Sequence, residues 1–333
     1  MPTGQPETVH RVAHEAMSTV FEVVATGREE GYVRQAARAA FDEIDRLERL
    51  FSRFDPSSEI SRLSRLAPGE SLPIGVETFE CLKVAAQVQA ETAGAFDVNI
   101  QARAGRPGGD PPPKKKGYGP RSAPKKAAPQ RGPRPLPNLL DLLELEACQE
   151  GFQAVRREEL AAVPLGLDLG GIGKGYALER ALDVLRDWDI GDVLLHAGTS
   201  TALACGTAPA RVTGSAGWPV AVATSWPAAG APRTVALRDF SLSGSGTEVK
   251  GGHVLDPRTG RPARGHRAAW AAHRSAAFSD ALATAFLVMS TAEVAAYCAV
   301  RPDVWALVIS GPKTCKIFNE RVLEETLSEG ADP

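Results

Sequence analysis

The chain has 333 residues, of which 43% are hydrophobic and 23% charged, a balance typical of a folded globular protein and not of a disordered chain. Its 38 basic and 40 acidic residues give a formal net charge of -2, so no overall field draws the molecule to nucleic acid or to an anionic membrane. The longest apolar runs fall well short of the roughly 20 residues that span a bilayer, so we expect no transmembrane helix. Together with the near-zero net charge, this predicts neither nucleic-acid nor membrane binding.

The first residues and the cysteines bear on the cellular compartment. Residues 1–18 lack the basic start, apolar core and cleavage site of a secretory signal. The five cysteines are widely spaced and form no C-x-x-C pair, which suits reduced thiols better than a disulfide framework or a zinc site. We therefore expect a cytoplasmic protein.

Apolar spacings of three and four residues predict a helix over residues 33–51, a second over 79–88 that stops before Gly94, and a third over 178–188. Short runs rich in β-formers predict strands at 192–196, 201–205, 220–224, 234–238, 253–255 and 304–310. These strands follow one another closely instead of each trailing a helix. We therefore expect an α+β fold with a mixed, mostly antiparallel sheet and packed helices.

One segment, 102–137, differs in composition from the rest of the chain. It holds ten prolines, six glycines and ten lysines or arginines, and has almost nothing to bury. We expect a disordered insert that is either a solvated linker or an arm for an acidic partner; no aromatic spacing indicates base stacking. The expected organisation is a flexible N-terminus (1–13), one domain (14–320) containing this insert, and a C-terminal tail (321–333).

A glycine-rich motif, LDLGGIGKGY, occupies residues 167–176 and predicts a strand end, a turn and a helix start. Such a turn presents backbone N–H groups to an anion, most often a phosphate. Two familiar templates fail, because a Walker loop needs Ser or Thr where Gly175 stands and the dinucleotide fingerprint needs Gly where Tyr176 stands. Tight packing of the helix on a strand is the alternative interpretation.

A second motif, HVLDPRTG at residues 253–260, follows the sequence SGSG at 243–246. The Asp-Pro-x-Thr-Gly portion forms a turn and needs no functional explanation. His253 is a candidate general base, because a neutral imidazole accepts a proton from an attacking hydroxyl. A histidine packed in a strand is the alternative.

A third motif places Asp280 and Thr284 four residues apart, on one face of a predicted helix that Ser279 or Asp280 would cap. Two hard oxygens and a nearby backbone carbonyl suit Mg²⁺, which usually keeps waters and substrate phosphates as its other ligands. Helix capping explains Asp280 equally well.

In order and spacing, the three motifs resemble the ApbE family of FAD:protein FMN transferases. Other segments agree: residues 17–19 (MST) resemble the family's Met-Gly-Thr, residues 50–63 its S-x-[YF]-x-x-x-S-E-[IL]-x-R-[LF] stretch, and residues 92–98 its T-G-G-A-F-D-[VP]. The resemblance runs from about residue 14 to residue 318. It implies an ApbE-like, T-fold-like architecture in one domain.

The resemblance also implies a reaction: Mg²⁺-dependent transfer of FMN from FAD to a Thr or Ser hydroxyl of a partner flavoprotein, with release of AMP. The implied Mg²⁺ ligands are the Gly171 carbonyl, the Asp280 carboxylate and the Thr284 hydroxyl, and His253 becomes the base. The implied FAD site comprises Met17, Phe54, Ala95, Phe96, Asp97, Asp168, Lys174 and Val254. Two alternatives stay open: hydrolysis of FAD to FMN and AMP, and a non-catalytic FAD-binding protein that interacts through the basic segment.

The chain also departs from the family. Ser18 and Ala93 stand where the family has glycine, and Phe54 stands where tyrosine is frequent. Thr199 lies in the sequence AGTS at 197–200, where the family commonly has a Gly-Gly pair. Members of the family are usually exported and often lipid-anchored, whereas this chain shows neither a signal nor a lipobox-like cysteine, so we expect its acceptor in the cytoplasm or facing it.

Overall fold

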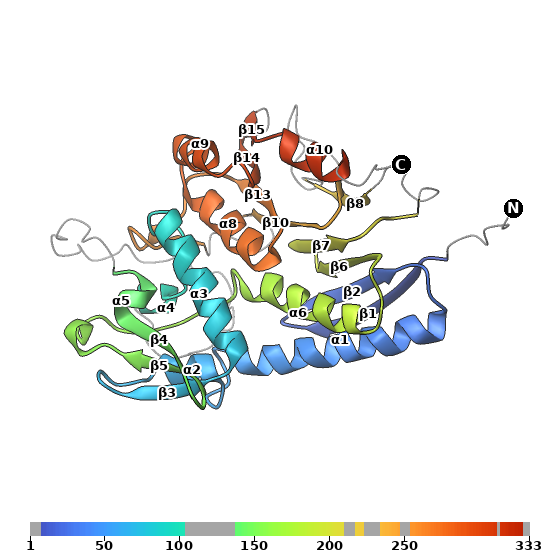
Figure 1. Ribbon diagram of the computed structural model, residues 1–333. Coiled ribbons are helices and arrows are strands. Elements are labelled where there is room, and N and C mark those ends of the chain that lie inside the picture. The colour runs from blue at the N-terminus through green and yellow to red at the C-terminus, as the bar shows by residue number, and fades with distance from the viewer. Residues whose placement is uncertain are drawn as a thin grey trace, which may run out of the picture.

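A computed structural model gives the fold for residues 8–103, 137–209, 217–222, 234–246, 254–311 and 314–328. Its centre is an eight-stranded sheet in which each pair of neighbouring strands is antiparallel (Figure 1). In spatial order the strands are β1 (His10–Ala16), β2 (Thr19–Ala25), β6 (Val193–Ala197), β7 (Thr201–Cys205), β10 (Phe240–Gly246), β13 (Ala268–His273), β14 (Trp305–Gly311) and β15 (Thr314–Phe318). The predicted α+β class with a largely antiparallel sheet is confirmed.

Both faces of this sheet are covered, which explains why its central strands are apolar at consecutive positions. Along β14, Ala306 and Val308 join a core cluster under the helices, whereas Trp305, Leu307 and Ile309 join a second cluster on the opposite face. The first face packs against α1 (Glu30–Phe51), α6 (Gly173–Asp187) and α8 (Ala276–Val288). The second face packs against β8 (Trp218–Ala221), β9 (Thr234–Leu237) and α10 (Arg321–Ser328).

A smaller three-stranded sheet lies at the lower left of Figure 1. Helix α3 (Val76–Glu91) runs from this sheet to α8 and joins the two parts through one continuous core. The strands are β3 (Ser71–Ile74), β5 (Gly151–Arg156) and β4 (Leu143–Cys148). The remaining short elements are α2 (Glu59–Leu63), α4 (Ile100–Arg103), α5 (Leu139–Leu142), the 3₁₀ helix η1 (Glu158–Leu160), β11 (Leu255–Asp256), β12 (Arg261–Pro262) and α9 (Thr291–Val300).

The ends of the chain differ from the predicted organisation. Strand β1 begins at His10 and pairs with β2 through its whole length, so the folded part starts before residue 14. Residues 321–328 form α10, whose Leu323 is buried against the second cluster, so the predicted tail begins with a helix. Residues 104–136 of the predicted insert lie outside the described residues.

Several predicted elements are displaced at their ends. The helix expected from residue 79 begins at Val76, because Gly75 already has extended backbone at the N-cap position. The segment 164–169 before the glycine-rich turn forms no strand, although the Asp168 N–H donates to the Val98 carbonyl at 2.8 Å. The strand expected at 253–255 is the two-residue β11, and His253 lies outside the described residues, as do 223 and 224 of the strand expected at 220–224.

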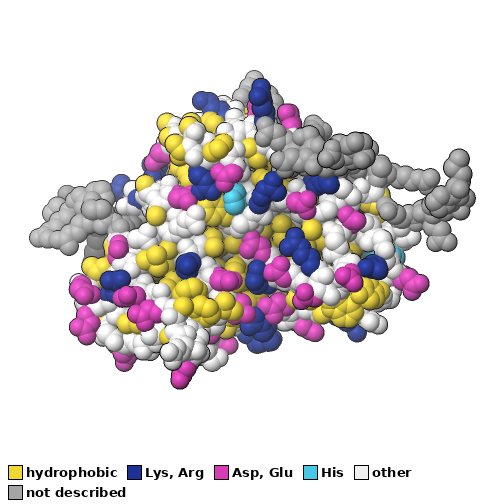
Figure 2. All heavy atoms as spheres, in the orientation of Figure 1, with side chains coloured by type: hydrophobic (Ala, Val, Ile, Leu, Met, Phe, Trp, Pro, Cys, Tyr) yellow, Lys and Arg dark blue, Asp and Glu magenta, His cyan; other side chains and the backbone are white. Residues whose placement is uncertain are grey.

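The surface mixes both charges. On the face shown in Figure 2, Lys and Arg side chains alternate with Asp and Glu and do not gather into a region of one sign, as expected from the near-zero net charge. Within the described ranges, no helix is both long and apolar enough to cross a membrane.

Two of the positions where this chain departs from the family pattern have left-handed backbone. Ser18 has a φ of 59° in the two-residue turn between β1 and β2, where Met17 also has a φ of 48°. Ala93, just after the C-cap of α3, has a φ of 49° and is followed by Gly94 with a φ of 77°. Glycine adopts such backbone without strain, whereas a side chain costs about 1–2 kcal/mol. The glycines of the family pattern therefore suit the backbone that this chain retains.

We expect Ala93→Gly to raise the free energy of unfolding by about 0.5–1 kcal/mol, because relief of the left-handed strain exceeds the entropy that glycine adds to the unfolded chain. Ala90→Gly, at an exposed position in the last turn of α3, is the matched control and should lower stability by about 0.5–1 kcal/mol. Urea unfolding of both variants measures the difference. Equal losses in the two variants would contradict the strain at Ala93.

Candidate active site

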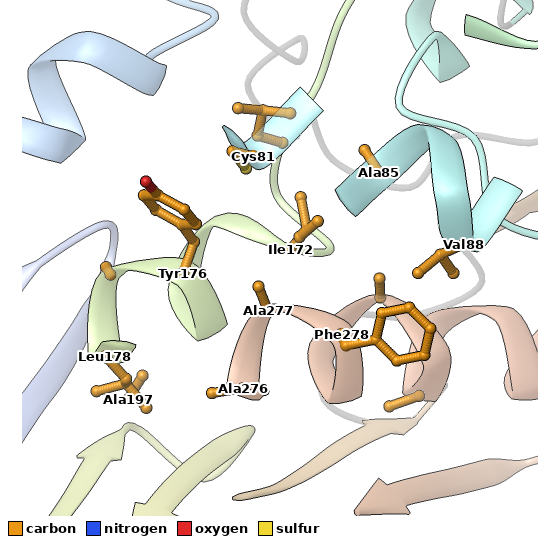
Figure 3. Close-up of a cluster of buried hydrophobic side chains, with 14 of the residues drawn as sticks. Cys81, Ala85, Val88, Ile172, Tyr176, Leu178, Ala197, Ala276, Ala277 and Phe278 are labelled. Carbon is orange, nitrogen blue, oxygen red and sulfur yellow. The ribbon is translucent and has the colours of Figure 1, made fainter. Parts of the chain in front are cut away.

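The glycine-rich turn and helix α8 meet at the N-terminus of α6. An added Cβ at Gly175, in the first turn of α6, would lie 2.0 Å from the carbonyl oxygen of Ala276 in α8. Figure 3 shows the small side chains at this crossing, with Ala276 and Ala277 of α8 beside Tyr176 of α6. The tight packing considered from the sequence is therefore real at Gly175, but it joins two helices and not a helix and a strand.

Gly171 brings three distant segments together. An added Cβ at this position would lie 3.2 Å from Cε2 of Phe96 and 3.2 Å from Oγ1 of Thr284. The glycine-rich turn, the segment 92–98 and α8 therefore converge on one point. Two of the implied metal ligands, Gly171 and Thr284, are neighbours in space.

Asp280 lies at the centre of this junction and is 3% exposed. Its Oδ2 accepts a hydrogen bond from the Gly175 N–H at 3.1 Å and lies 3.4 Å from Nζ of Lys174. Helix α8 begins at Ala276, where the Ser275 hydroxyl caps it by accepting from the Phe278 N–H at 3.1 Å. The expected cap by Ser279 or Asp280 is wrong, because both residues already lie inside the helix.

Thr284 follows Asp280 by one turn of α8, as its spacing predicts. Its hydroxyl lies 3.4 Å from the Asp280 carbonyl oxygen and 3.4 Å from the hydroxyl of Ser245 on β10. Thr284 is the one partly exposed residue in a helix whose other residues from Ala276 to Val288 are buried. An Asp carboxylate and a Thr hydroxyl, next to the backbone of Gly171, form a set of hard oxygen donors that fits Mg²⁺.

Across the part of the chain that the structure describes, no three His, Cys, Asp or Glu side chains gather into a metal-binding cluster. A cation held here would therefore rely on hydroxyl, backbone and water oxygens in addition to Asp280, which is the usual situation for Mg²⁺.

Buried hydroxyl groups fix α8 against the sheet. The Ser279 hydroxyl lies 2.9 Å from the hydroxyls of both Ser241 and Ser243 on β10, and all three residues are fully buried. At the start of α8, the Glu179 carboxylate of α6 accepts from the Ala277 N–H at 3.1 Å, and burial raises the pKa of Glu179. These bonds set the position of α8 relative to both β10 and α6.

Asp168 holds the glycine-rich turn from the other side. Its Oδ1 accepts from the Gly170 N–H at 2.9 Å, while Oδ2 accepts from Gln101 Nε2 at 2.8 Å and pairs with Arg53 Nε at 3.1 Å. Arg53 also lies over the ring of Phe54 at 4.1 Å, and Phe54 is 54% exposed. Arg53 and Gln101 were not predicted as site residues. The only available signal was the position of Arg53 next to Phe54.

Ala95, Phe96 and Asp97 are buried, and at least Asp97 has a structural task. Its Oδ1 accepts from the Asn99 N–H at 2.8 Å, which shapes the loop itself. Asn99 in turn accepts from the Gly166 N–H at 2.7 Å, so this loop is joined to the segment that leads into the glycine-rich turn.

Met17 and Val254 are partly buried against the first core cluster. Met17 lies in the β1–β2 turn, and the Val254 carbonyl accepts from the Ala263 N–H at 2.8 Å. The contacts described above bring Gly171, Lys174, Asp280, Thr284 and Phe96 together, and Met17 and Val254 pack against the core cluster to which Phe96 belongs.

Comparison with known proteins adds the family. The ApbE family model matches residues 17–308. The chain belongs to the ApbE family. A sequence comparison with curated proteins gives no match.

The ApbE fold extends over nearly the whole chain. The flavin transferase ApbE of Vibrio cholerae superposes with a TM-score of 0.72 at 18% identity, covering 96% of this chain and 99% of that one. The apo flavinyl transferase ApbE of Pseudomonas stutzeri gives 0.70 at 19% identity, with coverages of 97% and 99%. The ApbE protein of Thermotoga maritima gives 0.72 at 20% identity, with coverages of 95% and 99%. At these identities the likeness concerns the fold.

Proposed function

We propose that this ApbE-family protein transfers FMN from FAD to a Thr or Ser hydroxyl of a partner flavoprotein, in a Mg²⁺-dependent reaction that releases AMP. The observation that carries the proposal is the convergence of Gly171, Asp280 and Thr284 beside the N-terminus of α6. Two structurally similar proteins, from Vibrio cholerae and Pseudomonas stutzeri, are described as flavin or flavinyl transferases, which supports the same reaction class.

In this proposal the residues divide the work by position. Asp280, Thr284 and the Gly171 carbonyl hold Mg²⁺, which when bound neutralises charge on the pyrophosphate. The ammonium group of Lys174, at the N-terminus of α6, binds phosphate oxygens. Phe54, exposed and backed by the Arg53 guanidinium, offers an aromatic face for the flavin.

The proposed reaction is a phosphoryl transfer. The acceptor oxygen forms a bond to the phosphorus on the FMN side, the bond from that phosphorus to the bridging oxygen breaks, and AMP leaves. His253 accepts the proton of the attacking hydroxyl. Positioning and charge stabilisation supply most of the rate enhancement in reactions of this class.

One incubation tests the proposal. The protein is mixed with FAD, MgCl₂ and a candidate flavoprotein acceptor, and mass spectrometry detects the added FMN on the acceptor and free AMP; omission of the acceptor and addition of EDTA are the controls. Equal amounts of FMN adduct and AMP support the transferase. FMN and AMP without an adduct indicate FAD hydrolysis, and bound FAD without either product indicates a binding protein; both results contradict the proposal.

His253→Asn should lower FMN transfer by about 10²–10⁴-fold while FAD affinity changes little, because the loss of a general base affects chemistry more than binding. FAD affinity is measured by fluorescence quenching, and transfer is followed from pH 6 to pH 9. The alternative interpretation, a histidine packed in a strand, predicts that folding and FAD binding weaken together. A wild-type transfer rate with an unchanged pH profile would remove His253 from the mechanism.

A further inference from the structure

The ammonium group of Lys174 and a divalent cation at the proposed site require the same carboxylate. Nζ of Lys174 lies 3.4 Å from Oδ2 of Asp280 and 3.2 Å from the carbonyl oxygen of Gly170, which precedes the implied ligand Gly171. Lys174 therefore bridges α8 and the glycine-rich turn, the same two elements that a bound cation would join.

Burial strengthens the electrostatic interaction between Lys174 and Asp280. The Lys174 side chain is 14% exposed and that of Asp280 only 5%, so water screens their interaction poorly. Oδ2 also accepts the Gly175 N–H at 3.1 Å, which fixes the carboxylate in place. A second positive charge brought to this carboxylate meets the repulsion of the ammonium group at short range.

We infer that Lys174 competes with the divalent cation for Asp280, and that cation binding releases the ammonium group towards the anionic pyrophosphate of the substrate. The inference rests on the proposed function, and it assigns Lys174 a second task besides phosphate binding. Coupling between two sites is reciprocal: a lysine that weakens cation binding is itself loosened from Asp280 when the cation binds. Cation and FAD then bind in a coupled manner, because the cation frees a partner for the phosphates.

The test measures Mn²⁺ binding directly, from the free Mn²⁺ signal in electron paramagnetic resonance, with no substrate present. Lys174→Met should bind Mn²⁺ about tenfold more tightly than the wild type, because the competing charge is gone. Lys174→Gln, which keeps a donor for the Gly170 carbonyl but carries no charge, should show the same tightening. Lys83→Met is the matched control, because Lys83 is exposed on α3, over the ring of Phe79. This variant should bind Mn²⁺ with the affinity of the wild type.

A double-mutant cycle assigns the gain to Asp280. In an Asp280→Asn background, the substitution of Lys174 should no longer change Mn²⁺ affinity. Thermal melting gives a second readout. Mn²⁺ should stabilise Lys174→Met more than it stabilises the wild type, because Mn²⁺ replaces the positive charge of Lys174 beside the Asp280 carboxylate.

The outcomes separate this inference from the proposed function. Binding of Mn²⁺ that depends on Asp280 but is unchanged or weakened in both Lys174 variants overturns the competition and leaves the metal assignment intact. Binding that does not depend on Asp280, or no binding at all, overturns the metal assignment itself and the competition with it.

Discussion

Gly175→Ala should lower the free energy of unfolding by about 3 kcal/mol, at the upper end for overpacked sites, because the new Cβ meets a backbone oxygen that cannot rotate away. That oxygen belongs to Ala276 and would be 2.0 Å from the Cβ, so α6 and α8 must separate. Their separation also breaks the hydrogen bond from the Gly175 N–H to Asp280. Urea unfolding and Mn²⁺ binding measure the two effects.

A matched substitution gives the opposite sign. Gly31 also lies in the first turn of a helix, α1, and an added Cβ there meets no atom within 4 Å. Gly31→Ala should raise stability by about 0.5–1 kcal/mol, the ordinary preference of a helix for alanine. If Gly175→Ala were as harmless as Gly31→Ala, the close approach of α6 and α8 would be wrong.

Asp280→Asn should reduce Mg²⁺-dependent release of AMP from FAD by about 10²-fold or more, because the carboxylate charge is the main attraction for the cation at the proposed site. The asparagine amide oxygen can still accept the Gly175 N–H, so the fold should persist. Circular dichroism checks the fold, and AMP is quantified over a range of MgCl₂ concentrations.

The control for this variant is Asp183→Asn. Asp183 lies on α6, two turns after the glycine-rich loop, where its half-exposed carboxylate pairs with Arg180 and Arg186. This substitution removes the same charge from α6, the helix that packs against α8, and should leave AMP release unchanged. Unchanged Mg²⁺-dependent AMP release in Asp280→Asn would refute the assignment of Asp280 to the metal.

The sequence predicts helices and strands well where one face is buried and the other is exposed to solvent. Helix α1 shows this pattern, with eight buried residues at helical spacing, and its prediction was short by three residues at the N-terminus. Strand β6 was displaced by a single residue. Strand β1 was missed because its edge position leaves alternate residues exposed and few of them are strongly apolar.

Helix α8 shows why the cap was misplaced. Nearly all of its residues are buried, so no polar stripe marks where the helix starts. Ser279 and Asp280 look like capping residues in the sequence, yet Ser279 bonds to two serines of β10 and Asp280 to α6. The spacing of Asp280 and Thr284 placed them on one helix face all the same, because it depends only on the helix period.

The residues around Asp168 could not be found from local sequence. Arg53 lies 115 positions earlier, and Gln101 is 67 positions away, so both contacts arise from the tertiary fold. The motifs and their resemblance to the ApbE family predicted which residues carry the proposed chemistry, whereas the groups that hold them in position became visible only with the structure.

The bond between Gly175 and Asp280 also has a consequence for how the protein is made. The two residues are 105 positions apart, so the glycine-rich turn leaves the ribosome well before its partner helix is synthesised. At about 5–20 residues per second, this interval lasts roughly 5–20 seconds. When this interval begins, β2 and α1 have already been synthesised. α6 is completed early in the interval, β10, which anchors α8, is added later, and Asp280 is added last. The glycine-rich turn is therefore synthesised before the helix that completes its contacts, and the nascent chain gains Asp280, the proposed cation ligand, only after these 105 further residues have been added.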